Sequence, residues 1–357
     1  MTTLKKIMKT RRDSVIAFGI VILGYIVMQI MIRTGNISYS LNGLLVPICA
    51  YIVMAISLNL TVGILGELSL GHAGFMSVGA FSGVVVTALL SDSGVGSPVL
   101  RLLIAMVIGA ILAAIVGVIV GVPVLRLKGD YLAIVTLAFG EIIKNIINVL
   151  YIGVDSRGLH FGLIDPKFTL EEGGKMIIDG PIGVSGIERI STFTAGFVLI
   201  LFTLFIVLNL INSRHGRAIM AVRDNKIAAD SVGVSTTKFK LMAFVVSAAF
   251  AGMAGVLYAM NYSTVTAAKF DFNLSILVLV FVVLGGLGNI WGSVIAAAVL
   301  TLLPELLRAL DFNDYRMLIY AILLVAMMLF NNSGFKEKMV ARRAARKTAA
   351  AQKREVA

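Results

Sequence analysis

The residues that most often carry out catalysis are few and scattered in this chain. Its three histidines lie in distant parts of the sequence, at His72, His160 and His215, and Cys49 is the single cysteine. No HExxH or GxSxG motif occurs, so metal-dependent and serine hydrolase chemistry have no support. Gly174-Lys175 is followed by Met176 and lacks the glycine that a phosphate-binding loop needs at Thr169. We expect no catalysis, no metal site and no directly bound cofactor, with any ATP used by other polypeptides.

A few ionisable side chains fall inside apolar stretches and could line a path through a membrane. Glu141 lies near the middle of one such stretch, where a lone carboxylate is costly. Lys144 follows three residues later, so the two side chains share a helix face and can form an ion pair. Glu141 therefore has two interpretations, a structural ion pair or a place on the path. His72, between Gly71 and Gly74, either hydrogen-bonds a neighbouring backbone group or contacts a solute.

Glycine is concentrated at two points, GILGELSLGHAGFMSVGAFSG (63–83) and VVLGGLGNIWG (282–292). Small residues at this spacing let helices pack closely, and they also let a helix unwind beside a solute path. Two such interruptions, one in each half of the chain, are typical of transporters whose path runs between related halves. The residues that we take as candidates for a path are Gly71, His72, Glu141, Gly285 and Gly286.

The elements that must position these residues are apolar helices in a lipid bilayer. Of the 357 residues, 59% are hydrophobic and 14% are charged, which excludes a soluble enzyme, a secreted disulfide-linked domain and a disordered chain. We therefore expect an all-α polytopic membrane protein. Most of its apolar stretches approach the ~20 residues that span a bilayer, and ten are found, at 15–32, 42–62, 66–90, 102–125, 131–152, 192–212, 241–262, 274–287, 290–310 and 316–331. The stretch 274–287 is short, so it is a candidate broken or re-entrant helix.

The basic residues predict the orientation of these helices. Ten crossings place both termini on one side, and 21 of the 31 Lys and Arg residues then lie in the inner segments, against eight in the outer ones. Basic segments stay in the cytoplasm, so both termini, 1–14 and 332–357, are predicted to be cytoplasmic. The net charge of +12 then reflects this face and its contact with membrane lipid, and we expect no nucleic acid partner.

Two segments outside the membrane are long. The outer one, 153–191, is acidic and rich in glycine, which predicts irregular structure with one short amphipathic helix. It is either a docking surface for an extracytoplasmic partner or a solvated connector. The inner one, 213–240, predicts a single amphipathic helix from Arg217 to Val232, with Gly233 at a natural helix stop. That helix either docks a partner or lies at the lipid headgroups; its apolar positions are Ile219, Val222, Ile227 and Val232.

Four blocks of this sequence together match a known pattern: GELSLGHAGFMSVGA (66–80), LRLKGDYLAIVTLAFGEIIK (125–144), GRAIMAVRDNKIAADSVGVSTTKFKLMAFVVSAAFAGMAGVLYA (216–259) and VVLGGLGNIWGSVIAAAVLTLLPELLR (282–308). They resemble the LivM-type permease subunit of bacterial branched-chain amino acid ABC importers. The resemblance implies a permease domain over 15–331 that moves Leu, Ile or Val across the inner membrane by alternating access. It also implies the other subunits: two ATP-binding-cassette ATPases, a second, LivH-type permease and an extracytoplasmic solute-binding protein.

The same resemblance implies that 213–240 is the segment that couples the permease to the ATPase. Ala228-Ala229, followed after three residues by Gly233, matches the core of the importer motif, although Ile227 stands at its Glu position and the Ile-x-Leu-Pro ending is absent. Small residues permit close docking, and basic ones could pair with acidic ATPase groups. The coupling residues expected are Arg217, Arg223, Ala228, Ala229 and Gly233.

Two other functions stay open at this point. In the resembling family the glycine-rich stretch of the outer segment follows the fifth membrane segment closely, whereas here it lies farther along, at 173–187. Because this surface would face the binding protein, urea, short amides and other amino acids remain alternative substrates. An ion-coupled secondary transporter is a different class, and it would need further intramembrane acids.

Overall fold

The computed structural model describes residues 18–19, 21–35, 38–127, 129–155, 158–163 and 174–309, and the single positions 318, 321, 322 and 325. The chain divides into two compact units, Met1–Thr301 and Leu302–Ala357. Both predicted terminal segments, 1–14 and 332–357, and most of the predicted apolar stretch 316–331 lie outside the described residues. The functional features described below all lie in the first unit.

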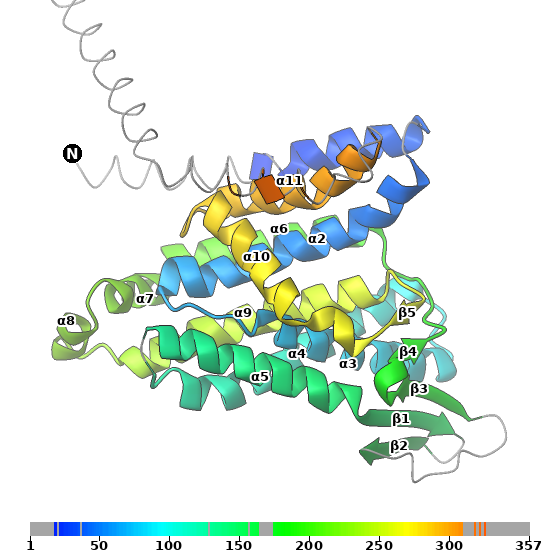
Figure 1. Ribbon diagram of the computed structural model, residues 1–357, viewed down its shortest axis with the longest axis horizontal. Coiled ribbons are helices and arrows are strands. Elements are labelled where there is room, and N and C mark those ends of the chain that lie inside the picture. The colour runs from blue at the N-terminus through cyan, green and yellow to red at the C-terminus, as the bar shows by residue number, and fades with distance from the viewer. Residues whose placement is uncertain are drawn as a thin grey trace, which may run out of the picture. The chain divides into compact units, whose positions relative to one another are not determined.

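Apolar helices make up most of the described chain (Figure 1). Five of them are long and apolar enough to cross a membrane, which confirms a polytopic membrane protein. Every predicted apolar stretch between 42 and 310 coincides with a helix, whereas the total of ten crossings stays a prediction. The described helices are Val21–Arg33, α2 (Tyr39–Asn59), α3 (His72–Asp92), α4 (Pro98–Val124), α5 (Asp130–Asn148), α6 (Phe193–Asn212), α7 (Arg214–Asp224), α8 (Lys226–Ser231), α9 (Thr236–Ala259), α10 (Phe272–Gly285) and α11 (Ile290–Ala309).

Close backbone contact between small residues holds α3, α4 and α9 together. A Cβ atom on Gly79 would lie 2.0 Å from the carbonyl oxygen of Gly252, and one on Gly255 would lie 1.9 Å from that of Met76. Only glycine permits such an approach, which increases the packing contacts that drive helix association in lipid. The predicted packing role of small residues is therefore confirmed in this core.

Both glycine-rich segments interrupt a helix, as expected. After Asn59, α2 continues as a π-helix, η1 (Leu60–Leu65), and ends at Gly66 in the left-handed conformation (φ 80°). An extended stretch then leads to α3. In the second segment, α10 ends at Gly285, and the backbone turns through Gly286 (φ 95°) and Gly288 (φ 78°) before α11.

The outer segment corrects the expectation of an all-α fold with irregular structure and one short helix. It forms an antiparallel sheet in the order β2-β1-β3 from β1 (Leu150–Asp155), β2 (Gly158–Leu163) and β3 (Lys175–Asp179). Two 3-10 turns, η2 (Gly180–Ile182) and η3 (Ala267–Phe270), flank a second pair of strands, β4 (Val184–Ser185) and β5 (Thr264–Val265). Because β1 begins at Leu150, the predicted membrane stretch 131–152 is also too long.

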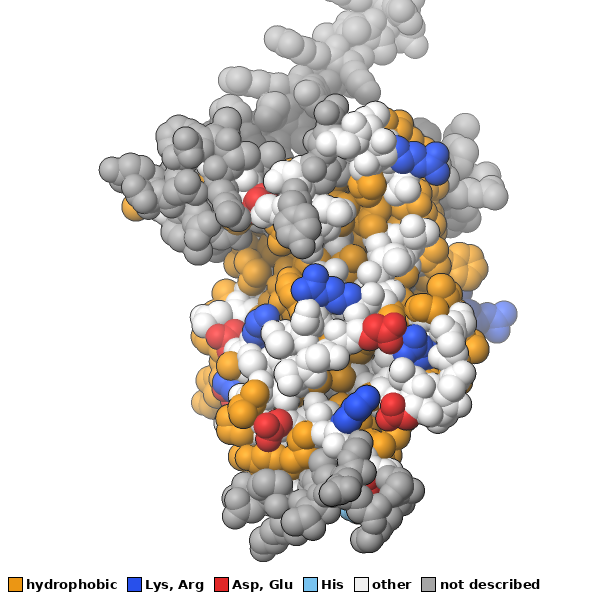
Figure 2. Space-filling model, turned by 90° about the vertical axis from the view of Figure 1, so that its right-hand side faces the viewer, with side chains coloured by type: hydrophobic (Ala, Val, Ile, Leu, Met, Phe, Trp, Pro, Cys, Tyr) orange, Lys and Arg blue, Asp and Glu red, His pale blue; other side chains and the backbone are white. Residues whose placement is uncertain are grey.

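The strands and the short helices α7 and α8 lie at opposite ends of the helical unit (Figure 1). This is the arrangement that the charge pattern predicted for segments 153–191 and 213–240. Figure 2 shows the strand-bearing end, where acidic and basic side chains are interspersed among uncharged groups.

Candidate functional site

The inner segment forms two helices rather than the single helix predicted for 217–232. Asn225 lies between α7 and α8 with an extended backbone (φ −154°, ψ 104°), and its side chain accepts a hydrogen bond from the Ala228 N–H at 3.0 Å. Asparagine is a strong helix N-cap, so it starts α8 at the point where α7 ends. The break lets the two short helices take different directions.

The apolar residues of these helices also divide between buried and exposed positions. Ile219 and Val222 of α7 are buried, and Ile219 packs in a cluster with Leu60, Ile64 and other residues of α9 and η1. Ile227 and Val232, by contrast, are 83% and 76% exposed, so the four predicted apolar positions do not share one environment. The structure therefore leaves α8 with exposed apolar side chains.

Of the importer motif residues, Ala228 and Ala229 lie within α8 and Gly233 follows its end. Ala229 is buried and Ala228 is exposed. Gly233 ends the helix in the left-handed conformation (φ 81°), and its N–H donates to the Asp230 carbonyl at 3.0 Å. The predicted helix stop is confirmed, and docking of this turn to a partner stays a prediction.

Arg223 and Arg217 differ in what they contact. The Arg223 guanidinium donates to the carbonyl of Gly63 within η1 at 3.1 Å, and also to the Asp224 carboxylate. A Cβ on Gly66 would lie 2.6 Å from Cγ of Arg223, so the arginine stem packs against that turn. Among the described residues, the Arg217 side chain donates to the Asn212 carbonyl alone. Arg223 therefore joins the inner segment to the broken helix.

A second link to the same turn was missed by sequence reasoning. Lys240, in the first turns of α9, forms an ion pair with Glu67, just after η1, and both side chains are largely buried. The N–H of Glu67 in turn donates to the Thr61 carbonyl at 3.1 Å. A lone acid directly after an apolar run was the only sequence signal for this pair.

The two glycine-rich interruptions meet each other through Asn59, which sequence reasoning also missed. Its side-chain carbonyl accepts from the Gly288 N–H at 2.8 Å, and its amide donates to the Ser293 hydroxyl at 2.8 Å. A Cβ on Gly63 would lie 2.2 Å from the Gly288 nitrogen. Asn59 is a buried polar group inside an otherwise apolar helix, and that contrast is the signal that could have found it.

Three of the five path candidates lie in tight packing. A Cβ on Gly71 would lie 2.0 Å from the Thr136 carbonyl of α5, and one on Gly285 would lie 2.4 Å from the Ser293 nitrogen. His72 is buried, and its Nε2 lies 2.8 Å from the Ser57 hydroxyl. The same hydroxyl also hydrogen-bonds the Met54 carbonyl at 2.8 Å. The partner of His72 is thus a side chain and not the predicted backbone group.

Glu141 and Lys144 form the ion pair that their spacing allows. Their side chains are 32% and 20% exposed, and the crevice beside Glu141 holds no space for a water molecule. The other path candidate, Gly286, has a positive φ of 95°, and a Cβ there would lie 3.6 Å from Cβ of Asn289, an ordinary contact distance. The described conformation therefore brings the two interruptions together without an open path at these residues.

This combination defines a class of protein. Apolar helices interrupted at two packed glycine-rich points, with a basic helical pair at one end, are the parts of a multi-pass membrane transport protein. Within the described part of the chain, no cluster of His, Cys, Asp or Glu could hold a metal ion.

Comparison with known proteins identifies the family. This chain belongs to the family of permease components of branched-chain amino acid transport systems, whose model matches residues 40–328. It is therefore a multi-pass permease of the bacterial inner membrane and a transport component, not an enzyme.

Individual relatives agree with this family. The chain is 37% identical to the high-affinity branched-chain amino acid transport system permease protein LivM of Salmonella typhimurium, over 80% of this chain and 67% of that protein. LivM of Escherichia coli shows the same identity and coverage. LivH of Salmonella typhimurium is 24% identical, over 80% of this chain and 90% of that permease. No solved structure matches this chain significantly.

Proposed function

We propose that this chain is the membrane-spanning subunit of an ATP-binding-cassette importer that carries Leu, Ile and Val across the bacterial inner membrane. The observation that supports this best is the 37% identity to two LivM proteins over 80% of the chain. The chain itself binds no ATP, and separate ATPase subunits supply the energy.

The working complex contains three kinds of partner subunit. Similarity to both LivM and LivH supports a second, related permease subunit beside this one. Two ATPase subunits dock on the end that bears α7 and α8, and a solute-binding protein docks on the strand-bearing end. In this arrangement 15–331 is the permease domain, 153–191 is extracytoplasmic, and 213–240 is the cytoplasmic coupling segment between cytoplasmic termini 1–14 and 332–357.

Alpha-helix α8 is the element that enters the ATPase in this proposal. Its exposed Ile227 and Val232 offer apolar surface to a groove, and the small residues Ala228 and Gly233 allow close approach. Movement of α7 and α8 then reaches the broken helix through two contacts, Arg223 with the Gly63 carbonyl and the ion pair of Lys240 with Glu67. Both contacts act on the π-helical turn η1.

The solute path opens in this proposal when the two interruptions separate. Gly63 lies against Gly288 in the described conformation, so this contact is the point at which the interruptions would part, while Gly71 packs on α5 and Gly285 on α11. His72, Glu141 and Gly286 would then border the path. This mechanism is alternating access, because the closed conformation lies between a state open to one side of the membrane and a state open to the other.

Reconstitution tests the proposed function against its rivals. The complex that co-purifies with this chain is placed in vesicles with its binding protein, and uptake of labelled leucine is measured with and without ATP. ATP-dependent leucine uptake is expected. Uptake of urea or a short amide alone would favour the related importers, and leucine uptake by this chain alone under an ion gradient would favour a secondary transporter.

A further inference from the structure

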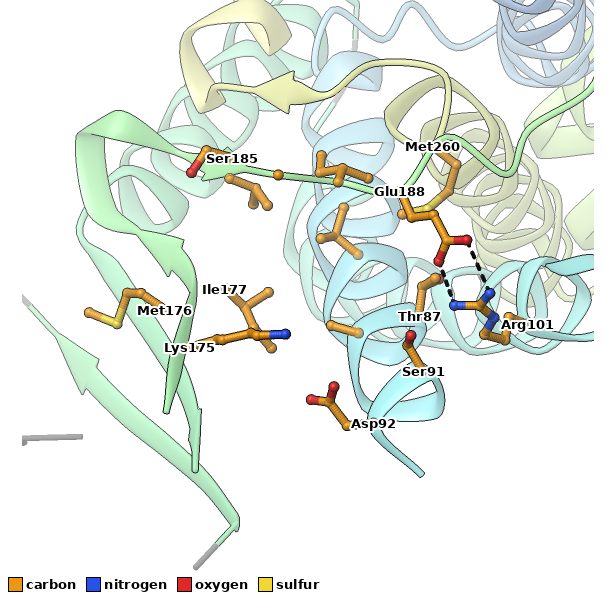
Figure 3. Close-up of a pocket in the computed structure, with 15 residues that line it drawn as sticks. Thr87, Ser91, Asp92, Arg101, Lys175, Met176, Ile177, Ser185, Glu188 and Met260 are labelled. Atoms are coloured by element: carbon orange, nitrogen blue, oxygen red, sulfur yellow. Dashed lines mark hydrogen bonds and ion pairs between the residues drawn. The ribbon is translucent and has the colours of Figure 1, made fainter. Parts of the chain in front are cut away.

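A cavity of about 180 Å³ opens at the strand-bearing end, among α3, the first turn of α4, β3 and β4 (Figure 3). One water needs roughly 10–15 Å³ of such space, so the cavity has room for a small solute. Buried apolar side chains form much of its wall, namely Val84, Ile177, Val184 and Met260. None of the path candidates lines it.

Arg101 is a buried cation in the wall of this cavity. It is only 5% exposed, and it donates to Glu188 from Nη1 at 2.7 Å and from Nη2 at 3.3 Å. Its Nε–H has no hydrogen-bond partner among the described residues. A buried donor without a partner is costly, and a cation in the first turn of α4 also opposes the helix dipole. Stability of the fold alone does not explain this arrangement.

Two further charges of opposite sign border the same space. Asp92 is at the end of α3 and Lys175 is in β3, and the side chains of both make no hydrogen bond or ion pair with another described residue. Figure 3 shows their charged groups directed toward the space between the strand and the helix, with the Ser91 hydroxyl on the same helix. The cavity therefore presents positive and negative groups together.

The balance of charge and apolar surface selects one class of ligand. Arg101 and Lys175 match Asp92 and Glu188 in number, so an ion of either sign would meet a like charge at close range. A zwitterion instead finds a partner for each of its charges. The apolar wall then suits an aliphatic side chain, because burying such a group removes it from water.

We propose that this cavity binds one amino acid with an aliphatic side chain, its carboxylate held by Arg101 and its ammonium group by Asp92. The inference rests on the proposed function, which places the strand-bearing end outside the membrane. Here the cavity receives the solute before the path between the glycine-rich interruptions opens.

Equilibrium binding of labelled leucine to the purified complex, without binding protein or nucleotide, tests this site. Leucine should bind saturably and be displaced by valine. Leucinamide, which lacks the carboxylate, and 4-methyl-2-oxopentanoate, which lacks the ammonium group, should compete at least about tenfold less well, since each loses one charge-assisted interaction. These competitors leave the protein unchanged, so misfolding cannot cause the result.

Variants then locate the site. Asp92→Asn should weaken leucine binding about tenfold, and Ala88→Phe, which fills the cavity, should abolish it. Arg189→Gln is the matched control, because Arg189 lies on the same end but contacts Ser263 outside the cavity. The proposal is overturned if wild type shows no saturable binding, if the two analogues compete as well as valine, or if Asp92→Asn binds like Arg189→Gln.

The same preparation separates this inference from the proposed function. If leucine is taken up with binding protein and ATP but direct binding is unselective or absent, the proposed cavity site is wrong and the proposed importer function stands. If there is no uptake but direct leucine binding depends on Asp92, the proposed importer function is wrong and the proposed site stands.

Discussion

Arg223 illustrates how one residue's contacts change its interpretation. Its charge and position predicted a partner on the ATPase, whereas its guanidinium binds the Gly63 carbonyl at 3.1 Å inside this chain. A carbonyl at the irregular turn of a π-helix is a good acceptor for a cation, since such turns leave backbone groups poorly satisfied. We infer that Arg223 transmits movement to η1.

Replacing Arg223 with glutamine should reduce transport per complex about tenfold while ATP hydrolysis continues. The lost charge-assisted hydrogen bond is worth ~1.5–3 kcal/mol, enough for a change of that size. Parallel assays of leucine uptake and phosphate release would measure it. Arg217→Gln is the control, because the Arg217 guanidinium donates to the Asn212 carbonyl at the end of α6 and, among the described residues, makes no hydrogen bond to η1. Equal effects of the two substitutions would contradict a special role for Arg223.

Glu141 offers a second test at this scale. We expect Glu141→Gln to lower the amount of assembled complex, because Lys144 would remain unpaired in a membrane segment at a cost of ~2.5–3.5 kcal/mol. The double variant Glu141→Gln, Lys144→Met should recover assembly. Quantitative purification reports assembly, and uptake per complex reports function. Full assembly of the double variant with no transport would show that Glu141 also serves the solute path that it borders in the proposed mechanism.

At the scale of elements, Gly233 ends α8 and positions its exposed side chains. Gly233→Leu should uncouple ATP hydrolysis from transport, because a bulky side chain at φ 81° costs ~1–2 kcal/mol and crowds the proposed docking turn. Gly94→Leu is a matched control, since Gly94 has nearly the same φ of 80° in open space away from the inner segment. Normal uptake by the Gly233 variant would count against docking at this turn.

Sequence patterns predicted the long helices and both interruptions because twenty-residue apolar runs and glycine clusters have few alternative structures in a bilayer. They did not predict β1 to β3, whose short strands are interspersed with glycines that also suit loops. They also missed the division at Asn225, because apolar spacing continues across it. Contacts such as Asn59 with Gly288 depend on which distant segments meet, and no local pattern encodes that.

At the scale of the whole molecule, we expect solute recognition and solute passage to be carried out by different proteins. In the proposed importer, apolar helices with isolated polar groups offer little discrimination among neutral or zwitterionic solutes, so we expect most selection to come from the binding protein. Pairing the complex with binding proteins of different specificity should therefore extend transport to other neutral amino acids, as measured by competitive uptake. Continued exclusion of every neutral amino acid that such a protein captures would show a selective path.

Helix α9 is continuous from the end that bears α7 and α8 to the strand-bearing end. Lys240 lies near its start, at the end that bears α7 and α8, and Met260, directly after its last residue, lines the cavity at the strand-bearing end. Its 24 residues span ~36 Å, so a tilt of about 5° would move the far end by ~3 Å. Thermodynamic linkage then requires reciprocity: if nucleotide changes the affinity of the outer end for solute by some factor, solute changes the affinity for nucleotide by the same factor.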